Sequence, residues 1–189
     1  VKLTNTGNSN YGVYKYYGNY NYFKNNSFHV AGGYPVYYYG GSYHQSDYNN
    51  LKGNTYVGYF GSAYTSISAW QNATVYGDHS KSVTPNYLSN NDLHVFDFAL
   101  NGAGVAIPGI TTDIDGETRA TNPDIGADEF IVVSRDAAIT EIIEPNDTTG
   151  IGTRAVKVRL KNMGSNTFVS ATIHWSVDGV VGTSYSWTG

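Results

Sequence analysis

The chain has 189 residues, of which 40% are hydrophobic and 14% charged, and its formal net charge is −4 at pH 7. This hydrophobic content is enough for a folded core, while the absence of cysteine excludes disulfides and thiolate metal ligands. Residues 1–130 carry six bases against ten acids, which excludes a basic nucleic-acid platform, and no apolar run reaches the roughly 20 residues of a membrane-spanning helix.

Glycine and tyrosine are unusually abundant, with 22 and 18 residues. Tyrosine favours strands and glycine favours tight turns, so this composition argues against amphipathic helices. We therefore predict an all-β protein.

The first part of the chain contains an internal repeat. A shift of 21 positions aligns residues of the same or similar type: Gly12 with Gly33, Tyr16 with Tyr37, Tyr17 with Tyr38, Tyr38 with Tyr59, and Asn5 with Asn26 and Asp47. Such a period is typical of a parallel β-solenoid, whose coils stack about 4.8 Å apart. We predict parallel coils from about residue 10 to residue 110, with Tyr17, Tyr38 and Tyr59 in one column. This column is either a structural ladder or a surface on which sugar rings stack.

Two segments beyond the repeat have strand-like patterns. Residues 66–70 end on Trp70, and residues 93–98 alternate between apolar and polar side chains. We predict a strand at each, with His94 on the strand surface. Asp78, His79 and Ser80 are adjacent and cannot face one another as a catalytic triad must, so we interpret them as a loop with self-capping side chains and predict no catalytic residues.

The segment from Thr111 to Phe130 holds six acids around a single base, Arg119. The acids are Asp113, Asp115, Glu117, Asp124, Asp128 and Glu129. A polar segment of this kind, interrupted by glycines, is typical of an ordered loop. Its carboxylates would bind Arg119, backbone amides or a metal ion. We predict a structural closing loop in which Arg119 is buried and paired with at least one aspartate, namely Asp113, Asp115, Asp124 or Asp128.

Calcium is the alternative organiser of this loop. Asp113, Asp115 and Glu117 resemble the start of a calcium-binding loop, in which carboxylates alternate beside a glycine. The EF-hand pattern nevertheless fails, because Thr118 and Asp124 stand where it needs glycine and glutamate. A different oxygen cage for calcium stays open, and no other cofactor is expected.

The composition changes after Phe130, where apolar β-branched residues replace tyrosine and asparagine. We predict a boundary there, with residues 1–130 and 131–189 as separate domains. Strands are expected near residues 137–143, 155–160 and 171–177, each bounded by turn residues.

Two segments carry a resemblance to known families. Residues 113–119 and 123–130 resemble the closing segment of secreted bacterial right-handed parallel β-helix proteins, especially large surface proteins of the Bacteroidetes type. Residues 161–165 and 175–179 resemble the opening strands of an immunoglobulin-like module of the CARDB kind. The resemblance implies terminal β-helix coils in residues 1–130, followed by a partial immunoglobulin-like β-sandwich in residues 131–189.

The resemblance also implies a function. It indicates a non-catalytic structural or adhesive segment of a large extracellular or cell-surface protein, exported through an outer-membrane (type IX) secretion system. The partners would be polysaccharides or cell-surface ligands, together with secretion or anchoring machinery. The alternatives are the C-terminal part of a β-helix polysaccharide lyase or other carbohydrate-active enzyme, and a glycan-binding module. Because a sandwich needs about seven strands, we expect the protein to continue past Gly189, and the alternative is that another chain lends the missing strands by edge addition.

Overall fold

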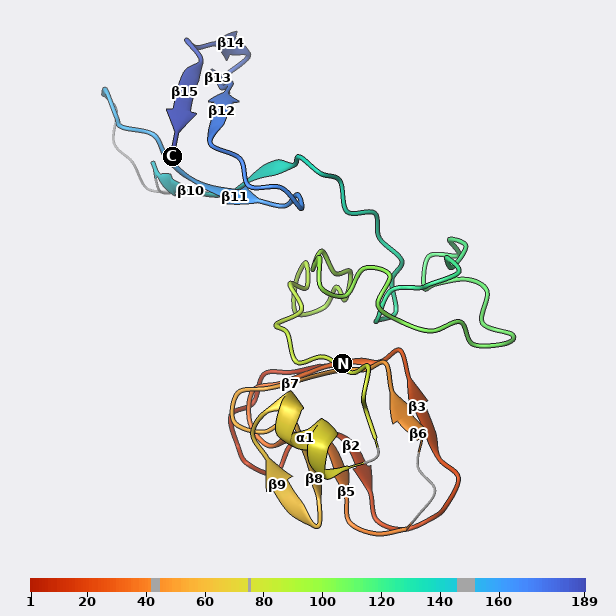
Figure 1. Cartoon of the computed structure of the whole chain (residues 1–189). Coiled ribbons are helices and arrows are strands. Elements are labelled where there is room, and N and C mark those ends of the chain that lie inside the picture. Colours follow the sequence, from red (N-terminus) through yellow and green to blue (C-terminus); the bar gives the residue numbers. More distant parts are fainter. Residues whose placement is uncertain (42–44, 75, 146–151) are drawn as a thin grey trace. The chain divides into compact units, whose positions relative to one another are not determined.

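The computed structural model describes residues 1–41, 45–74, 76–145 and 152–189. The chain divides into two compact units, Val1–Ile131 and Val132–Gly189 (Figure 1). The described residues are mostly sheet with one short helix, which confirms the all-β prediction. Within these ranges, no helix has the length and apolar character that crossing a bilayer requires.

The first unit is built from short strands and helix α1. The elements are β1 (Lys2–Leu3), β2 (Tyr11–Lys15), β3 (Tyr22–Lys24), β4 (Ser27–Val30), β5 (Tyr34–Tyr38), β6 (Gln45–Asp47), β7 (Asn50–Gly53), β8 (Gly58–Phe60), β9 (Ser62–Tyr64) and α1 (Ile67–Ala73).

Strands of the first unit pair in parallel with strands one repeat further along the chain. One sheet contains β1, β4 and β7, a second contains β2, β5 and β8, and a third contains β3 and β6. Partner residues in β2 and β5, in β3 and β6, and in β4 and β7 lie 23 positions apart. From β1 to β8, consecutive strands belong to different sheets, so the chain returns to each sheet after about one repeat.

The predicted register of 21 positions and the predicted extent of the coils are wrong. The register is 23 positions in three of the pairings, 22 between β5 and β8 and 27 between β1 and β4, whereas 21 was predicted. Parallel strand pairing ends at Phe60, because β9 turns back antiparallel to β8. Beyond it the described residues add a single parallel bridge, between Asn50 and Lys81, and they form no closed solenoid.

Buried asparagine side chains connect the coils. The Asn49 side chain is fully buried, and its Oδ1 accepts hydrogen bonds from the backbone amide of Asn26 at 2.9 Å and from Asn26 Nδ2 at 3.0 Å. Its Nδ2 donates to the carbonyls of Phe23 at 2.7 Å and Asp47 at 3.0 Å. Asn26 and Asn49 are one repeat apart, so the asparagine column joins these residues and does not join Asn26 to Asp47 as the shift of 21 predicted.

Helix α1 replaces the strand predicted at residues 66–70. Ser66 caps the helix, since its side chain accepts a hydrogen bond from the backbone amide of Ala69 at 3.2 Å. Trp70 then points into the core and contacts the rings of Tyr38 and Tyr64. The buried core cluster consists of Phe28, Val36, Tyr38, Leu51, Val57 and Trp70. In Figure 1, α1 lies beside β8, where a Cβ on Gly58 would come within 2.5 Å of the Trp70 ring.

The strand predicted at residues 93–98 is also absent. Val95 forms only an isolated antiparallel bridge with Tyr87. The Val95 amide donates to the carboxylate of Asp128 at 3.3 Å. A side chain of the closing loop therefore takes the place of a neighbouring strand.

The second unit contains antiparallel pairs of strands. They are β10 (Ala137–Glu144) with β11 (Lys157–Asn162), β12 (Ser170–Ile173) with β15 (Tyr185–Thr188), and β13 (Ser176–Val177) with β14 (Val180–Val181). β10 and β11 coincide with predicted strands, while the predicted strand at 171–177 is divided between β12 and β13. The described strands of this unit pair only two by two, and large apolar side chains such as Ile142 and Val177 stay exposed around a hollow of about 1330 Å³.

We predict that Asn49→Leu lowers the free energy of unfolding of the first unit by about 3 kcal/mol, because it leaves the partly buried Asn26 amide and Phe23 carbonyl without their Asn49 partner. Asn54→Ala, at an exposed position in the turn after β7, should change it by less than about 0.5 kcal/mol. Urea unfolding of both variants measures the difference, and equal stabilities would contradict the proposed importance of the asparagine column.

Candidate functional site

Tyrosines form a row across the outer face of the β2–β5–β8 sheet. Tyr37 lies between Tyr14 and Tyr59, with ring centroids 5.3 Å and 4.2 Å away and interplanar angles of 17° and 5°. Tyr14 and Tyr37 are partners in the register, and so are Tyr37 and Tyr59. Parallel stacking therefore places these rings directly above one another, where they form offset stacks.

A second row of tyrosines runs beside the first. The Tyr34 ring stacks between Tyr11, at 6.2 Å and 9°, and Tyr56, at 4.6 Å and 11°. The two rows meet edge to face, with the Tyr34 and Tyr37 rings 5.2 Å apart at 78°. The result is a continuous aromatic surface. We call this surface, formed by Tyr11, Tyr14, Tyr34, Tyr37, Tyr56 and Tyr59, the tyrosine face.

The tyrosine face carries no charge from its own strands. Lys15, the cation of β2, is buried, and its Nζ donates to the Gly40 carbonyl at 2.9 Å. Desolvation beside the other rings, followed by the charge and hydrogen bond of Tyr59, raises the pKa of Tyr37. Its phenol therefore stays neutral at physiological pH and presents a hydroxyl to the surface.

The first row ends at a small residue. Tyr59 is the register partner of Ala63 in the antiparallel pair of β8 and β9. Directly opposed residues of an antiparallel pair lie on the same face of the sheet. A methyl group cannot cover an aromatic ring, so no aromatic side chain of the described residues covers the outer ring face of Tyr59 in this direction, whereas Tyr37 is covered on both sides.

The predicted column of Tyr17, Tyr38 and Tyr59 is wrong. Tyr38 is fully buried in the core, where desolvation raises its pKa to about 12. Tyr17 is 67% exposed and contacts Tyr16 edge-on. Because the register is 23 rather than 21, Tyr38 aligns with Lys15, and only Tyr59 of the three predicted residues belongs to the tyrosine face.

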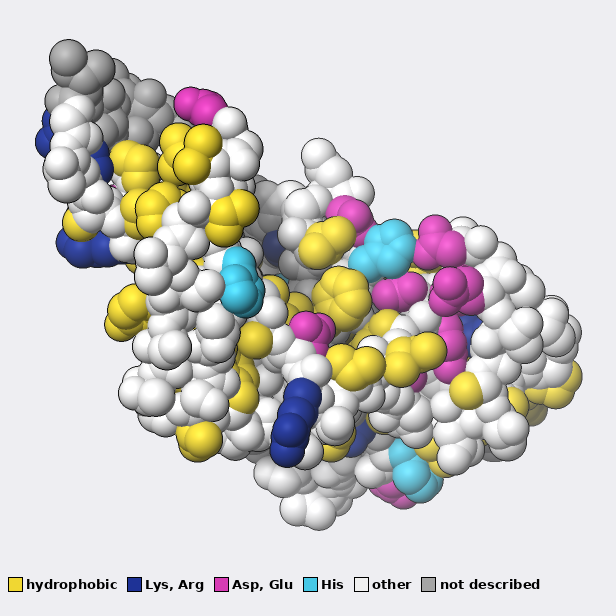
Figure 2. Space-filling view, turned by 90° about the horizontal axis from the view of Figure 1, so that it is seen from above, with side chains coloured by type: hydrophobic (Ala, Val, Ile, Leu, Met, Phe, Trp, Pro, Cys, Tyr) yellow, Lys and Arg dark blue, Asp and Glu magenta, His cyan; other side chains and the backbone are white. Residues whose placement is uncertain are grey.

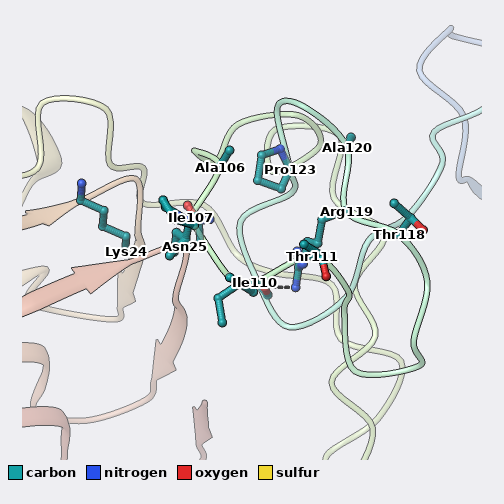
Figure 3. Close-up of a pocket in the computed structure, with 13 residues that line it drawn as sticks. Lys24, Asn25, Ala106, Ile107, Ile110, Thr111, Thr118, Arg119, Ala120 and Pro123 are labelled. Carbon is teal, nitrogen blue, oxygen red and sulfur yellow. Dashed lines mark hydrogen bonds between the residues drawn. The ribbon is translucent and has the colours of Figure 1, made fainter.

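The closing loop is attached to the coils at Asn25. The Asn25 side chain donates to the Val105 carbonyl at 2.7 Å and accepts from the Val105 amide at 2.9 Å, while its backbone carbonyl accepts from Gly126 at 3.1 Å. A cavity of about 510 Å³ lies at this junction, with Lys24 and Asn25 on one side and Arg119 and Pro123 on the other (Figure 3). Most of its lining is apolar or backbone, and Arg119 turns its donors to the loop.

Carboxylates of the loop accept hydrogen bonds from backbone amides. Asp113 accepts from Asp115 at 3.0 Å, Glu117 at 2.8 Å and Glu129 at 3.0 Å. Partial desolvation opposes ionisation, but these three hydrogen bonds outweigh it and lower the pKa of Asp113. Asp113 therefore replaces the backbone partners that a strand would otherwise supply.

Asp124 and Glu129 continue this pattern. Asp124 is almost fully buried and accepts from the amides of Gly102 at 2.6 Å and Phe130 at 2.8 Å. Desolvation is the largest influence and raises the pKa of Asp124. Glu129 accepts from the amides of Ala120 and Asp124, both at 3.1 Å.

Arg119 is buried, and its carboxylate partner differs from the prediction. Its side chain is 11% exposed and pairs with Glu129 at 3.1 Å, and no ion pair joins it to the four predicted aspartates. The same guanidinium donates to four backbone carbonyls of one turn, those of Asp124, Gly126, Ala127 and Asp128, at 2.7–3.4 Å. Arg119 therefore holds the turn at residues 124–128 closed.

His94 lies among acidic side chains that the sequence analysis did not connect with it. Its Nδ1 contacts Asp92 Oδ1, and its Nε2 lies 2.7 Å from Asp115 Oδ2. The hydrogen bond to Asp92, then that to Asp115, raises the pKa of His94 to about 9. The spacing of Asp92 and His94 was a local signal, but the approach of Asp115 from 21 residues away was not visible in the sequence.

A second histidine forms a simpler pair. His79 Nδ1 lies 2.7 Å from Asp47 Oδ2, and the His79 ring stacks on Tyr48 at 4.4 Å and 3°. Ser80 is buried, and its hydroxyl accepts from the Asn49 amide at 3.1 Å. The segment 78–80 thus binds the coils through distant partners. Histidines beside acidic side chains are visible on the surface in Figure 2.

The calcium candidates do not gather around one point. Among the described residues, the group that brings metal-ligating atoms within 4.8 Å of one another is His94, Asp115 and Asp128, not Asp113, Asp115 and Glu117. Asp113 is unsuitable because its two carboxylate oxygens already accept three amides.

Comparisons with known proteins found no matching family model, no similar curated protein and no similar solved structure.

We predict that Arg119→Ala lowers the free energy of unfolding of the first unit by about 3–5 kcal/mol, because it leaves Glu129 buried without its cation. Arg119→Lys should restore little of the lost stability, since an ammonium cannot reach several carbonyls at once. The matched control is Arg159→Ala, which removes an exposed pair with Glu141 and should cost about 1 kcal/mol or less. A loss at Arg119 as small as that at Arg159 would contradict this role.

We predict that the His94 ring titrates near pH 9 in chelator-treated protein and that Asp115→Asn lowers this pKa. Because the folded pKa lies above the ordinary value of 6.5, the stabilisation from this charge is complete below about pH 6.5 and is lost as the pH rises through about 9. Chemical-shift titration of the ring measures the pKa directly. Titration near 6.5 would show that the two aspartates do not hold the charged ring.

Proposed function

We propose that this chain is a non-catalytic adhesive segment of an extracellular protein and that its tyrosine face binds glycans. The observation that carries the proposal is the pair of stacked tyrosine rows, of which the first ends at Ala63. The open ring of Tyr59 offers a flat apolar surface to one sugar ring. The phenolic hydroxyls of the neighbouring rows supply hydrogen-bond donors and acceptors for sugar hydroxyls.

The rows also explain why binding would be limited to particular rings. Tyr37 and Tyr34 are covered on both sides by other tyrosines, so a sugar cannot stack on them. The accessible surfaces are the ends of the rows and the outward edges of the rings. Tyr14, at the opposite end of the first row, is 49% exposed, and its ring also stacks against Tyr16 at 6.5 Å and 16°. A glycan chain lying along the sheet would contact both ends.

Charge favours a neutral glycan. Residues 1–130 carry a net charge of −4, and the strands of the tyrosine face present no exposed cation, because Lys15 is buried. A polyuronate would be repelled by the negative charge of this unit, whereas a neutral polysaccharide would bind without this electrostatic repulsion. This reasoning separates the proposal from a polysaccharide lyase, which needs bases or cations beside an acidic substrate.

The wider setting is part of the same proposal. We infer that the parallel pairings of the first unit are the last coils of a right-handed β-helix and that the second unit is part of an immunoglobulin-like module. The extracellular location and export through an outer-membrane secretion system are supported by the sequence resemblance of residues 113–119 and 123–130. Stacked coils suit an adhesive stalk, because they repeat one surface along an axis.

Glycan-array screening followed by calorimetry tests the proposal. We predict that the full chain binds neutral polysaccharides and that Tyr59→Ala weakens binding about 10-fold, equivalent to about 1.4 kcal/mol. Tyr59→Phe should keep most of the affinity, because the ring surface remains. Tyr22→Ala is the matched control, since Tyr22 is an exposed tyrosine of the separate β3–β6 sheet.

Two outcomes would contradict the proposal. The first is absence of binding to any neutral glycan, or equal losses in Tyr59→Ala and Tyr22→Ala. The second is release of new reducing or unsaturated sugar ends by the purified chain, which would favour the alternative of a carbohydrate-active enzyme.

A further inference from the structure

Three segments of the first unit meet beside His94. The imidazole lies between Asp92 and Asp115, and Asp128 approaches from the far end of the closing loop. Potential ligand atoms of His94, Asp115 and Asp128 all lie within 4.8 Å of one another. We propose that these three residues bind a divalent transition-metal cation and that zinc suits them best.

The donor set decides the class of metal. One imidazole nitrogen and two carboxylate oxygens form a borderline set, which zinc binds at about 2.0–2.2 Å with four ligands. Calcium instead takes six to eight oxygens. Two ligands of a tetrahedral zinc ion lie roughly 3.4 Å apart, so His94 Nε2 and Asp115 Oδ2, now 2.7 Å apart, would separate slightly. Asp115 is half exposed and free to move, and the fourth position would be left to water.

Asp92 positions the metal-binding nitrogen. Its Oδ1 contacts His94 Nδ1 and also accepts from the His94 backbone amide at 3.1 Å. When Nδ1 donates to Asp92, the lone pair of a neutral ring lies on Nε2, which faces Asp115. A carboxylate that orients a histidine in this way is the usual outer partner of metal-binding histidines.

Asp128 supplies an independent reason for a cation. The residue is 6% exposed, yet its carboxylate accepts one long hydrogen bond, from the Val95 amide at 3.3 Å. Asp113 and Asp124 have more and shorter amide partners. Among the described residues, no lysine or arginine forms an ion pair with Asp128, because Arg119 is directed to Glu129. A buried carboxylate with so few partners needs a cation close to it. The charged His94 ring supplies this cation in the metal-free protein, and a bound metal ion would take over the role as it displaces the ring proton.

A bound ion would also connect parts of the unit that have no strands. His94 belongs to the segment after α1, while Asp115 and Asp128 lie at opposite ends of the closing loop. Binding to the folded state alone stabilises it, so the melting temperature should rise with metal concentration.

Calorimetric titration of the chelator-stripped full chain with ZnCl₂ tests the proposal, with MnCl₂ and CaCl₂ as comparisons. We expect about one zinc ion per chain and a higher melting temperature. Asp115→Asn and His94→Gln should each weaken zinc binding about 10-fold or more, and Asp92→Asn should weaken it by about 10- to 100-fold. Of these substitutions, Asp115→Asn should disturb folding least, because the Asp115 carboxylate contacts His94 at the surface. Circular dichroism verifies that each variant is folded.

The matched control is His79→Gln, which removes a histidine paired with a single carboxylate, Asp47. Zinc affinity should be unchanged in this variant. The proposal is overturned if zinc does not bind, if His79→Gln weakens binding as much as Asp115→Asn, or if folded Asp115→Asn binds zinc like the parent chain. Calcium binding stronger than zinc binding would overturn the class of metal.

Discussion

The structure depends on parallel pairing of residues that lie about 23 positions apart. This spacing returns the chain to the same three sheets, so each residue lies next to its register partner in the following coil. The two side chains must therefore pack against each other. Inside, Asn49 bonds to Asn26 and satisfies backbone groups of the turn. Outside, Tyr14, Tyr37 and Tyr59 stack as a row. One register thus produces both the buried polar column and the aromatic surface.

The closing loop solves a different problem, because its backbone has few strand partners. Carboxylates take over that role. Asp113 and Asp124 accept backbone amides, and Arg119 donates to the carbonyls on the inside of the turn. The high density of acids is therefore mainly a way to satisfy backbone groups. Asp128 fits this explanation poorly, and for this reason the proposed metal site is centred beside it.

Composition was sufficient to predict strands and turns, and the repeat in the first 60 residues did indicate parallel pairing. The exact register was not predictable, because tyrosines at neighbouring positions align almost as well at 21 as at 23. That difference of two positions moved Tyr38 from the surface column to the core. Helix α1 was missed because Ile67 to Trp70 also fits a strand, and the Ser66 cap decides the outcome. The density of acids indicated a closed loop around Arg119, but Glu129 and the carbonyls, not the four aspartates, hold it.

Disulfide cross-linking measures the register most directly, because the protein contains no cysteine of its own. Partner residues of adjacent parallel strands lie about 4.8 Å apart, within the Cα separation that a disulfide accepts. The double variant Tyr14→Cys, Tyr37→Cys should therefore cross-link rapidly under mild oxidation, while Tyr16→Cys, Tyr37→Cys, which matches a shift of 21, should cross-link far more slowly. Faster cross-linking of the second pair would contradict the register on which both the asparagine column and the tyrosine face depend.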